Sequence, residues 1–95
     1  MSIDSSPQRF TDTQGQYLAF IYYYDLVNRR PPAEADIQAF FGVTPPTVHR
    51  MIIELERRGL ISRIPRQARS IAVTVPPDEI PQLRRQSIET SASRY

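Results

Sequence analysis

The sequence predicts a single, mainly α-helical domain in which three helices precede a small β-hairpin. Three observations lead to this prediction. Residues 44–58 show a helical hydrophobic period with signals at both ends, two further helical segments precede them, and after Gly59 the apolar period changes to strict alternation. With 95 residues and no cysteine, the chain can form one modest core without disulfide bonds.

The first helix is expected to run from Thr11 to about Asn28. Thr11 and Gln14 have the spacing of a capping box, and Phe10 is placed for a hydrophobic staple. The inward stripe is expected to contain Leu18, Ile21 and either Tyr17 or Tyr24. Residues 22–24 are all tyrosine, and because successive helical residues point about 100° apart, at least one of them should be exposed. Such a tyrosine is either ordinary surface or part of a face for self-association or phosphate contact.

A second helix is expected over Ala33–Phe41. Residues 29–32, Arg-Arg-Pro-Pro, end the first helix because a residue before proline avoids the helical region. Ile37 and Phe41 should point inward, and Gly42 suits a left-handed residue after the last turn. The neighbouring Phe40 is expected to lie partly outside, either as ordinary surface or in a dimer patch.

The third helix is the best defined. Thr44 suits the N-cap, Pro45 the first helical position and Gly59 the residue beyond the end. Its buried stripe should consist of Val48, Ile52 and Leu55. Its other face begins with four residues that we assign as candidate DNA contacts: Pro46, Thr47, His49 and Arg50. A helix, a turn and a helix with a polar first turn form the arrangement that enters the DNA major groove.

Two strands are expected next, at residues 60–64 and 70–75, joined by a loop at residues 65–69. The candidate DNA contacts in this hairpin are Arg63, Arg66, Gln67 and Arg69. A basic hairpin behind such a helix is the wing of a winged helix-turn-helix, and Arg66 and Arg69 would reach phosphates or the adjacent minor groove.

We therefore predict a flexible arm at residues 1–9, a winged helix-turn-helix DNA-binding domain at 10–75, and a tail at 76–95. A short helix is possible in the tail from Asp78 onward, with Ile80 and Leu83 along one side.

The net charge of +2 is unevenly distributed. Residues 1–43 carry −2, residues 44–75 carry +4, and residues 76–95 are neutral overall. The excess of arginine therefore lies on the third helix and the wing, as expected of a nucleic-acid face; the alternative is a merely solvated surface.

The order and spacing of several pieces resemble the N-terminal DNA-binding domain of LexA-type repressors. The matching residues are Phe10-Thr11, Gln14, Leu18, Phe20, Ile21, Tyr24, Pro31-Pro32, Ile37, Gly42, Thr47-Val48-His49, Leu55-Glu56, Arg58-Gly59-Leu60-Ile61, Arg69 and Ile71. The resemblance implies a three-helix winged module with Thr47, His49 and Arg50 at the reading end of the third helix and the wing on the DNA backbone.

The sequence also departs from the family pattern. The turn before Thr47 is one residue shorter than is typical, and Pro45-Pro46 offer no N–H to a phosphate. Arg29 stands where the family often has glycine, and Asp25 where it often has an apolar residue. LexA-type repressors also carry a self-cleaving peptidase domain that uses a Ser/Lys pair; these 95 residues contain no lysine, so we expect no peptidase domain here and no such reaction.

The composition argues against catalysis in general. His49 is the only histidine, which together with the lack of cysteine and lysine excludes the usual triads and Schiff bases. No metal site, cofactor, membrane span or signal peptide is expected, and we expect a cytoplasmic location. No small-molecule ligand is implied.

Three functional hypotheses remain. The first is sequence-specific binding of double-stranded DNA by a repressor-like transcriptional regulator, acting as a homodimer because two half-sites multiply specificity. The second is a winged helix used for protein–protein interaction, in which His49 would be ordinary surface. The third is an RNA-binding or architectural accessory protein.

Overall fold

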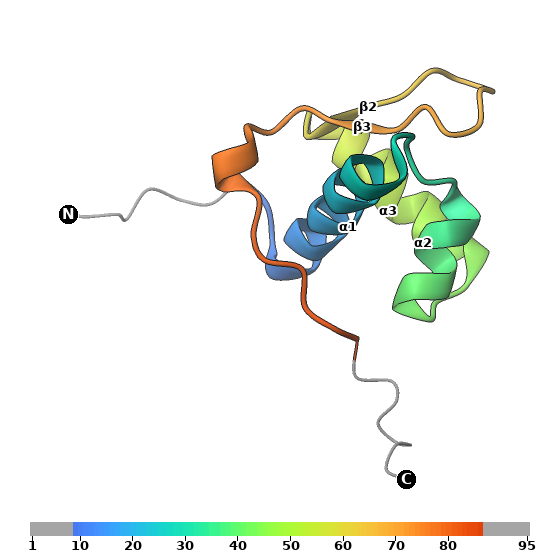
Figure 1. Cartoon of the computed structure of the whole chain (residues 1–95). Coiled ribbons are helices and arrows are strands. Elements are labelled where there is room, and N and C mark those ends of the chain that lie inside the picture. Colours follow the sequence, from blue (N-terminus) through green and yellow to red (C-terminus); the bar gives the residue numbers. More distant parts are fainter. Residues whose placement is uncertain (1–8, 87–95) are drawn as a thin grey trace, which may run out of the picture.

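Three helices and a two-stranded antiparallel sheet make up residues 9–86, the part of the chain that the computed structural model describes (Figure 1). The elements in chain order are α1 (Asp12–Asn28), α2 (Glu34–Phe41), α3 (Pro45–Arg57), β2 (Ile61–Ser62), β3 (Ala72–Val73) and a 3-10 helix, η1 (Pro77–Glu79). This is the predicted class: three helices followed by a hairpin.

The ends of α1 and α3 follow the predicted capping signals. The Thr11 hydroxyl accepts from the Gln14 amide at 3.1 Å, and the Gln14 side chain accepts from the Thr11 amide at 3.0 Å, which completes the capping box. At α3, the Thr44 hydroxyl accepts from the amide of Thr47. Gly59 has a φ of +74°, as expected beyond the end of α3.

Helix α2 begins one residue later than predicted. Ala33 has extended backbone angles and is the N-cap. Its amide donates to the Asp36 carboxylate at 2.8 Å, which is the half of a capping box that the third helical residue supplies; the alanine side chain makes no cap of its own. Gly42 has a φ of +66° and ends α2 as predicted.

Helix α1 lies at the centre of the fold, and all of residues 14–21 are buried. The predicted inward residues of α3, Val48, Ile52 and Leu55, are fully buried in the core that they share with residues of α1. Tyr23 is 37% exposed, which confirms that the three consecutive tyrosines do not all face the core.

The two phenylalanines of α2 both pack on α1. Phe41 stacks on Tyr17 with ring centroids 4.3 Å apart, and Phe40 packs on Phe20 at 4.7 Å. Both are half-buried, so Phe40 is held within the fold by an aromatic contact.

The hairpin has shorter strands than predicted. Only Ile61 pairs with Val73 and Ser62 with Ala72, whereas residues 60–64 and 70–75 were expected. The ladder stops because a side chain takes over the pairing: the Ser70 hydroxyl accepts from the amide of Ile64 at 2.9 Å. Alternation nevertheless holds, since Ile71 and Val75 are buried and residues 72 and 74 are exposed.

The tail differs from the prediction in its conformation. Instead of a helix continuing from Asp78, a single 3-10 turn is followed by an extended segment at residues 80–86, which we call the strap. Pro81 has no N–H for a helical bond, and the strap is bonded elsewhere. The Gln16 amide group donates to the Gln82 carbonyl and accepts from the Arg84 amide, each at 2.8 Å.

The strap closes the side of α1 that α2 and α3 leave open. Ile80 and Leu83 pack partly buried against the core, and Arg84 forms an ion pair with Asp12. Pro81 lies so close to Gly15 that a Cβ there would be 3.1 Å from the proline ring. The predicted arm, apart from Arg9, and residues 87–95 lie outside the described residues, so the proposed domain limits remain predictions.

Candidate nucleic-acid interface

The first turn of α3 offers side chains to a partner, and no backbone amides. Pro45 and Pro46 have no N–H. The next amide, that of Thr47, donates to the Thr44 hydroxyl, and the two threonine hydroxyls are 2.9 Å apart. The start of α3 therefore offers no free amide to a phosphate. The amide and the hydroxyl of Thr47 are both engaged with the Thr44 hydroxyl that caps the helix.

The outward strip of α3 is formed by side chains three and four residues apart. Its exposed members are Pro46, His49, Arg50, Ile53 and Arg57. His49 Nδ1 lies 3.7 Å from a carboxylate oxygen of Glu34, at the start of α2. Arg50 is exposed, and within residues 9–86 its guanidinium forms no hydrogen bond or ion pair.

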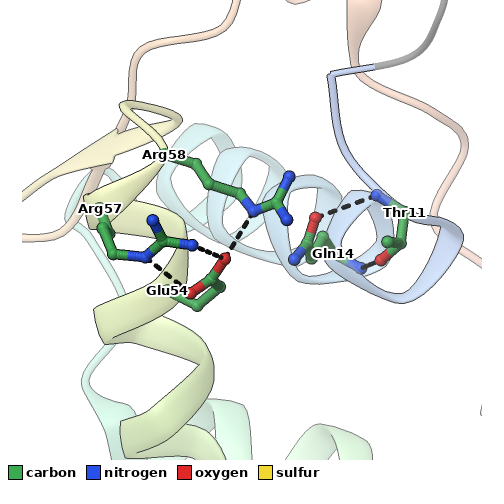
Figure 2. A network of polar contacts seen from close by, with 5 residues as sticks. All are labelled: Thr11, Gln14, Glu54, Arg57 and Arg58. Atoms are coloured by element: carbon green, nitrogen blue, oxygen red, sulfur yellow. Dashed lines mark hydrogen bonds and ion pairs between the residues drawn. The ribbon is translucent and has the colours of Figure 1, made fainter.

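The arginines at the other end of α3 are differently placed. Figure 2 shows the Glu54 carboxylate between the guanidiniums of Arg57 and Arg58, at 2.7 and 2.6 Å respectively. Hydrogen bonds from Arg57 and then Arg58 lower the pKa of Glu54 from 4.5 to about 2. Two guanidiniums share this one carboxylate, so the end of α3 keeps one positive charge, but its arginines are held by Glu54, whereas Arg50 at the start of the helix is not.

The wing divides the predicted contacts into two groups. Arg66 and Gln67 are exposed at the tip of the loop, and Arg66 has a φ of +65°. Arg63 instead lies against the body, where its Nε donates to Glu56 of α3 at 2.9 Å. Ser70 closes the loop, since its hydroxyl is also within hydrogen-bond distance of the Gln67 carbonyl.

Arg69 is the second inward wing residue. Its Nη1 atom lies 3.0 Å from the Asp36 carboxylate, 3.3 Å from the Pro31 carbonyl and 3.3 Å from the Tyr24 hydroxyl. The Ala33 amide, and then Arg69, lower the pKa of the Asp36 carboxyl. Arg69 thus contacts its own chain where a phosphate contact was predicted.

The exposed candidates gather on one side of the molecule. An open recess of about 300 Å³ separates the wing loop from the start of α2, with Ala33 and Glu34 on one wall and residues 66–69 on the other. Glu34 in turn reaches His49. Along the right-hand side of Figure 1, the wing tip, the start of α2 and the start of α3 accordingly follow one another.

Two residues of this side were not among the sequence candidates. Glu34 places a carboxylate between the wing and α3, and only the tertiary contact with His49 reveals it. Ile53 is 44% exposed on the outward strip. The pair Ile52-Ile53 held a signal for it, because neighbouring residues point about 100° apart, so a helix that is covered on one face cannot bury both equally.

Two kinds of site are not found in the described residues: a metal site and a membrane span. Across residues 9–86, no three His, Asp or Glu side chains gather in a group that would hold a metal ion. In the same span, no helix combines the length and the apolar character needed to cross a membrane.

An α2–turn–α3 unit packed on α1 and followed by a two-stranded wing defines a winged helix-turn-helix protein. The chain belongs to the MarR family, whose model matches residues 10–68.

The chain is also similar to LexA repressors from two bacteria, which confirms the resemblance inferred from the sequence. It is 36% identical over 66 residues to that of Thermosipho melanesiensis, covering 70% of this chain and 33% of the relative. It is 33% identical over 73 residues to that of Thermosipho africanus, covering 77% of this chain and 37% of the relative. The chain therefore spans about a third of the length of these relatives.

Proposed function

We propose that this chain is a transcriptional regulator that binds double-stranded DNA sequence-specifically, with α3 in the major groove and the loop at residues 65–69 on the backbone. The observation that carries the proposal is the exposed strip at the start of α3. Arg50 is unpaired there within residues 9–86, and the wing tip with Arg66 lies on the same side of the molecule. Family membership and the LexA relatives support the same function.

The proposed contacts follow from the chemistry of each side chain. Arg50 has the planar donor pair that binds O6 and N7 of guanine, and His49 can donate to or accept from a base edge. Arg66 and Gln67, at the wing tip, suit phosphate oxygens. Because α3 begins with two prolines, binding by side chains replaces the backbone contacts that a helix start would otherwise supply.

The proposal includes a homodimer and excludes catalysis. One module of this size buries limited DNA surface, and two copies on a symmetric or repeated site would supply the missing affinity and specificity. We place the protein in the cytoplasm, acting through binding without a cofactor. Analytical ultracentrifugation with and without DNA tests the dimer, and monomers under both conditions would refute it.

Selection of bound sequences from random duplex DNA, repeated at two salt concentrations, tests the function. The expected result is an enriched motif whose affinity falls steeply with added salt, because binding releases counterions from the phosphates. Arg50→Ala should then cost about 1–3 kcal/mol of specific binding and relax the base preference at one position.

Arg57→Ala is the matched control, since Arg57 lies on the same helix but is paired with Glu54. It should lose less than Arg50→Ala and keep the same motif. Salt-insensitive binding to a protein partner would favour a protein-interaction module, and preference for single strands or RNA would favour an RNA-binding role. Equal losses for both variants on any duplex would refute the assignment of Arg50 to base recognition.

A further inference from the structure

The loop of the wing, residues 64–68, is exposed, and the body of the protein holds the hairpin on either side of it, through Arg63 before the loop and Arg69 after it. The ladder of the hairpin consists of two residue pairs, Ile61 with Val73 and Ser62 with Ala72. Beyond them, Ile64 is 54% exposed, and the recess of about 300 Å³ separates the loop from the start of α2. Packing of the loop itself therefore does little to determine where its tip points.

One guanidinium links the end of the loop to the helical body. Arg69 Nη1 contacts a helix side chain from α1 (Tyr24), a backbone carbonyl of the α1–α2 connection (Pro31) and the carboxylate that caps α2 (Asp36). A single atom of the wing thereby meets three separate parts of the helical body.

The backbone of Arg69 has a conformation that is unusual for a residue with a side chain. Arg69 has a φ of +55°, a left-handed conformation in which glycine is the least strained residue. Glycine would ease the turn but would remove every one of these contacts. Arg66, three residues earlier, is also left-handed and lies in the preceding turn of the same short loop.

Energy alone does not explain the Arg69 contacts. The side chains of Arg69 and Asp36 remain 33% and 29% exposed, and partly exposed ion pairs add little to stability. These contacts matter more for geometry than for stability, because three fixed acceptors restrict the orientation of the wing at Arg69, which we call the wing root.

We propose that Arg69 is a positioning residue of the wing: it links the wing root to α1 and α2 and so holds Arg66 where it meets the DNA backbone. The inference rests on the proposed function and adds a role that differs from phosphate contact. Arg69 acts through Arg66, and its Nη1 atom makes its contacts within the chain.

Affinity for the selected duplex, measured by fluorescence anisotropy over a range of salt, separates the two roles of Arg69. Arg66→Ala should weaken binding by about threefold or more and lower the log–log salt slope by about 1. Arg69→Ala should weaken it by no more than Arg66→Ala does. The double variant should match Arg66→Ala within a factor of about two, because positioning has no effect once the positioned side chain is removed.

A direct phosphate contact by Arg69 would give a different pattern. The two losses would then multiply, and the double variant would lose about 2 from the salt slope. Arg69→Lys extends the comparison, because lysine keeps the charge but lacks the planar fork. We expect it to bind as weakly as Arg69→Ala; wild-type affinity for Arg69→Lys would overturn the proposal.

Tyr24→Phe is a milder second variant, which removes one acceptor and keeps the ring in place. Its matched control is Tyr23→Phe, one residue away, for which no hydrogen bond is recorded within residues 9–86. Tyr24→Phe should weaken DNA binding and Tyr23→Phe should leave it unchanged, with equal thermal midpoints showing that both are folded. Equal affinities for the two variants would count against the proposal.

The positioning role also has a measurement that needs no DNA. In ¹⁵N relaxation experiments, amides of residues 64–68 should become more mobile in Arg69→Ala than in the wild type, while those of α1 and α3 stay unchanged. Unchanged wing amides would refute the positioning role even if the protein binds DNA. Conversely, a wild type that fails to bind duplex DNA would refute the proposed function while the relaxation data still decide the role of Arg69.

Discussion

Two neighbouring isoleucines of α3 allow a sharp test of which face of this helix is presented to a partner. Ile52 is fully buried, whereas Ile53 is 44% exposed on the outward strip. Ile52→Ala removes three carbons from the core, worth about 2.4 kcal/mol of transfer free energy. The cavity left behind brings the expected loss to about 2–5 kcal/mol.

For Ile53→Ala the same change should cost less than about 1 kcal/mol, because much of the side chain is already in water and alanine is the better helix former. Urea unfolding followed by circular dichroism measures both values, and equal m-values would show that the unfolded states are comparable. In thermal unfolding, each kcal/mol should lower the midpoint by about 4–8 °C.

The comparison is decisive because the two residues differ only in direction. Equal losses, or a larger loss for Ile53→Ala, would mean that α3 is rotated by about 100° from its position in the structure. His49 would then take the buried place that Val48 has in the structure and Arg50 the place of His49, and the proposed interface would be refuted.

Three further predictions concern other parts of the fold. Arg29 ends α1 with a φ of +61°, so Arg29→Gly should stabilise the protein by up to about 1 kcal/mol in urea unfolding; a loss would show that the arginine side chain contributes more than its backbone costs. Gln16→Ala removes both hydrogen bonds to the strap and should lower the free energy of unfolding by about 1–3 kcal/mol. Hydrogen exchange at the Arg84 amide should become faster; unchanged exchange would show that the strap is not bound to α1 in this way. The pKa of Glu54 is lowered from 4.5 to about 2 on folding, so its stabilising contribution should be complete above pH 4.5 and lost as the pH falls towards 2. A ¹³C carboxyl titration measures this pKa, which Arg57→Gln should raise; a midpoint near 4.5 in the wild type would contradict the Glu54 contacts.

Local signals explain why the helices could be predicted closely. The capping box at Thr11, the Thr44 N-cap and the glycines at positions 42 and 59 all act within a few residues. The inward stripe of α3 follows from its period of about 3.6 residues, since one face of an isolated helix must be buried. The strands were overestimated because alternation continues beyond the paired residues, where the Ser70 side chain replaces the backbone partner.

Sequence by itself therefore determined the three helices, the hairpin that follows them, and the outward position of His49, Arg50 and Arg66. Only the tertiary structure decided which arginines are available to a partner. Arg69 meets acceptors 33, 38 and 45 residues away, and Arg63 meets a glutamate seven residues before it. Such pairings have no period and no motif, because they depend on where chain segments meet after the core has formed. The strap was hidden for the same reason: Gln16 binds backbone atoms 66 and 68 residues further along, and every residue type other than proline offers the same groups.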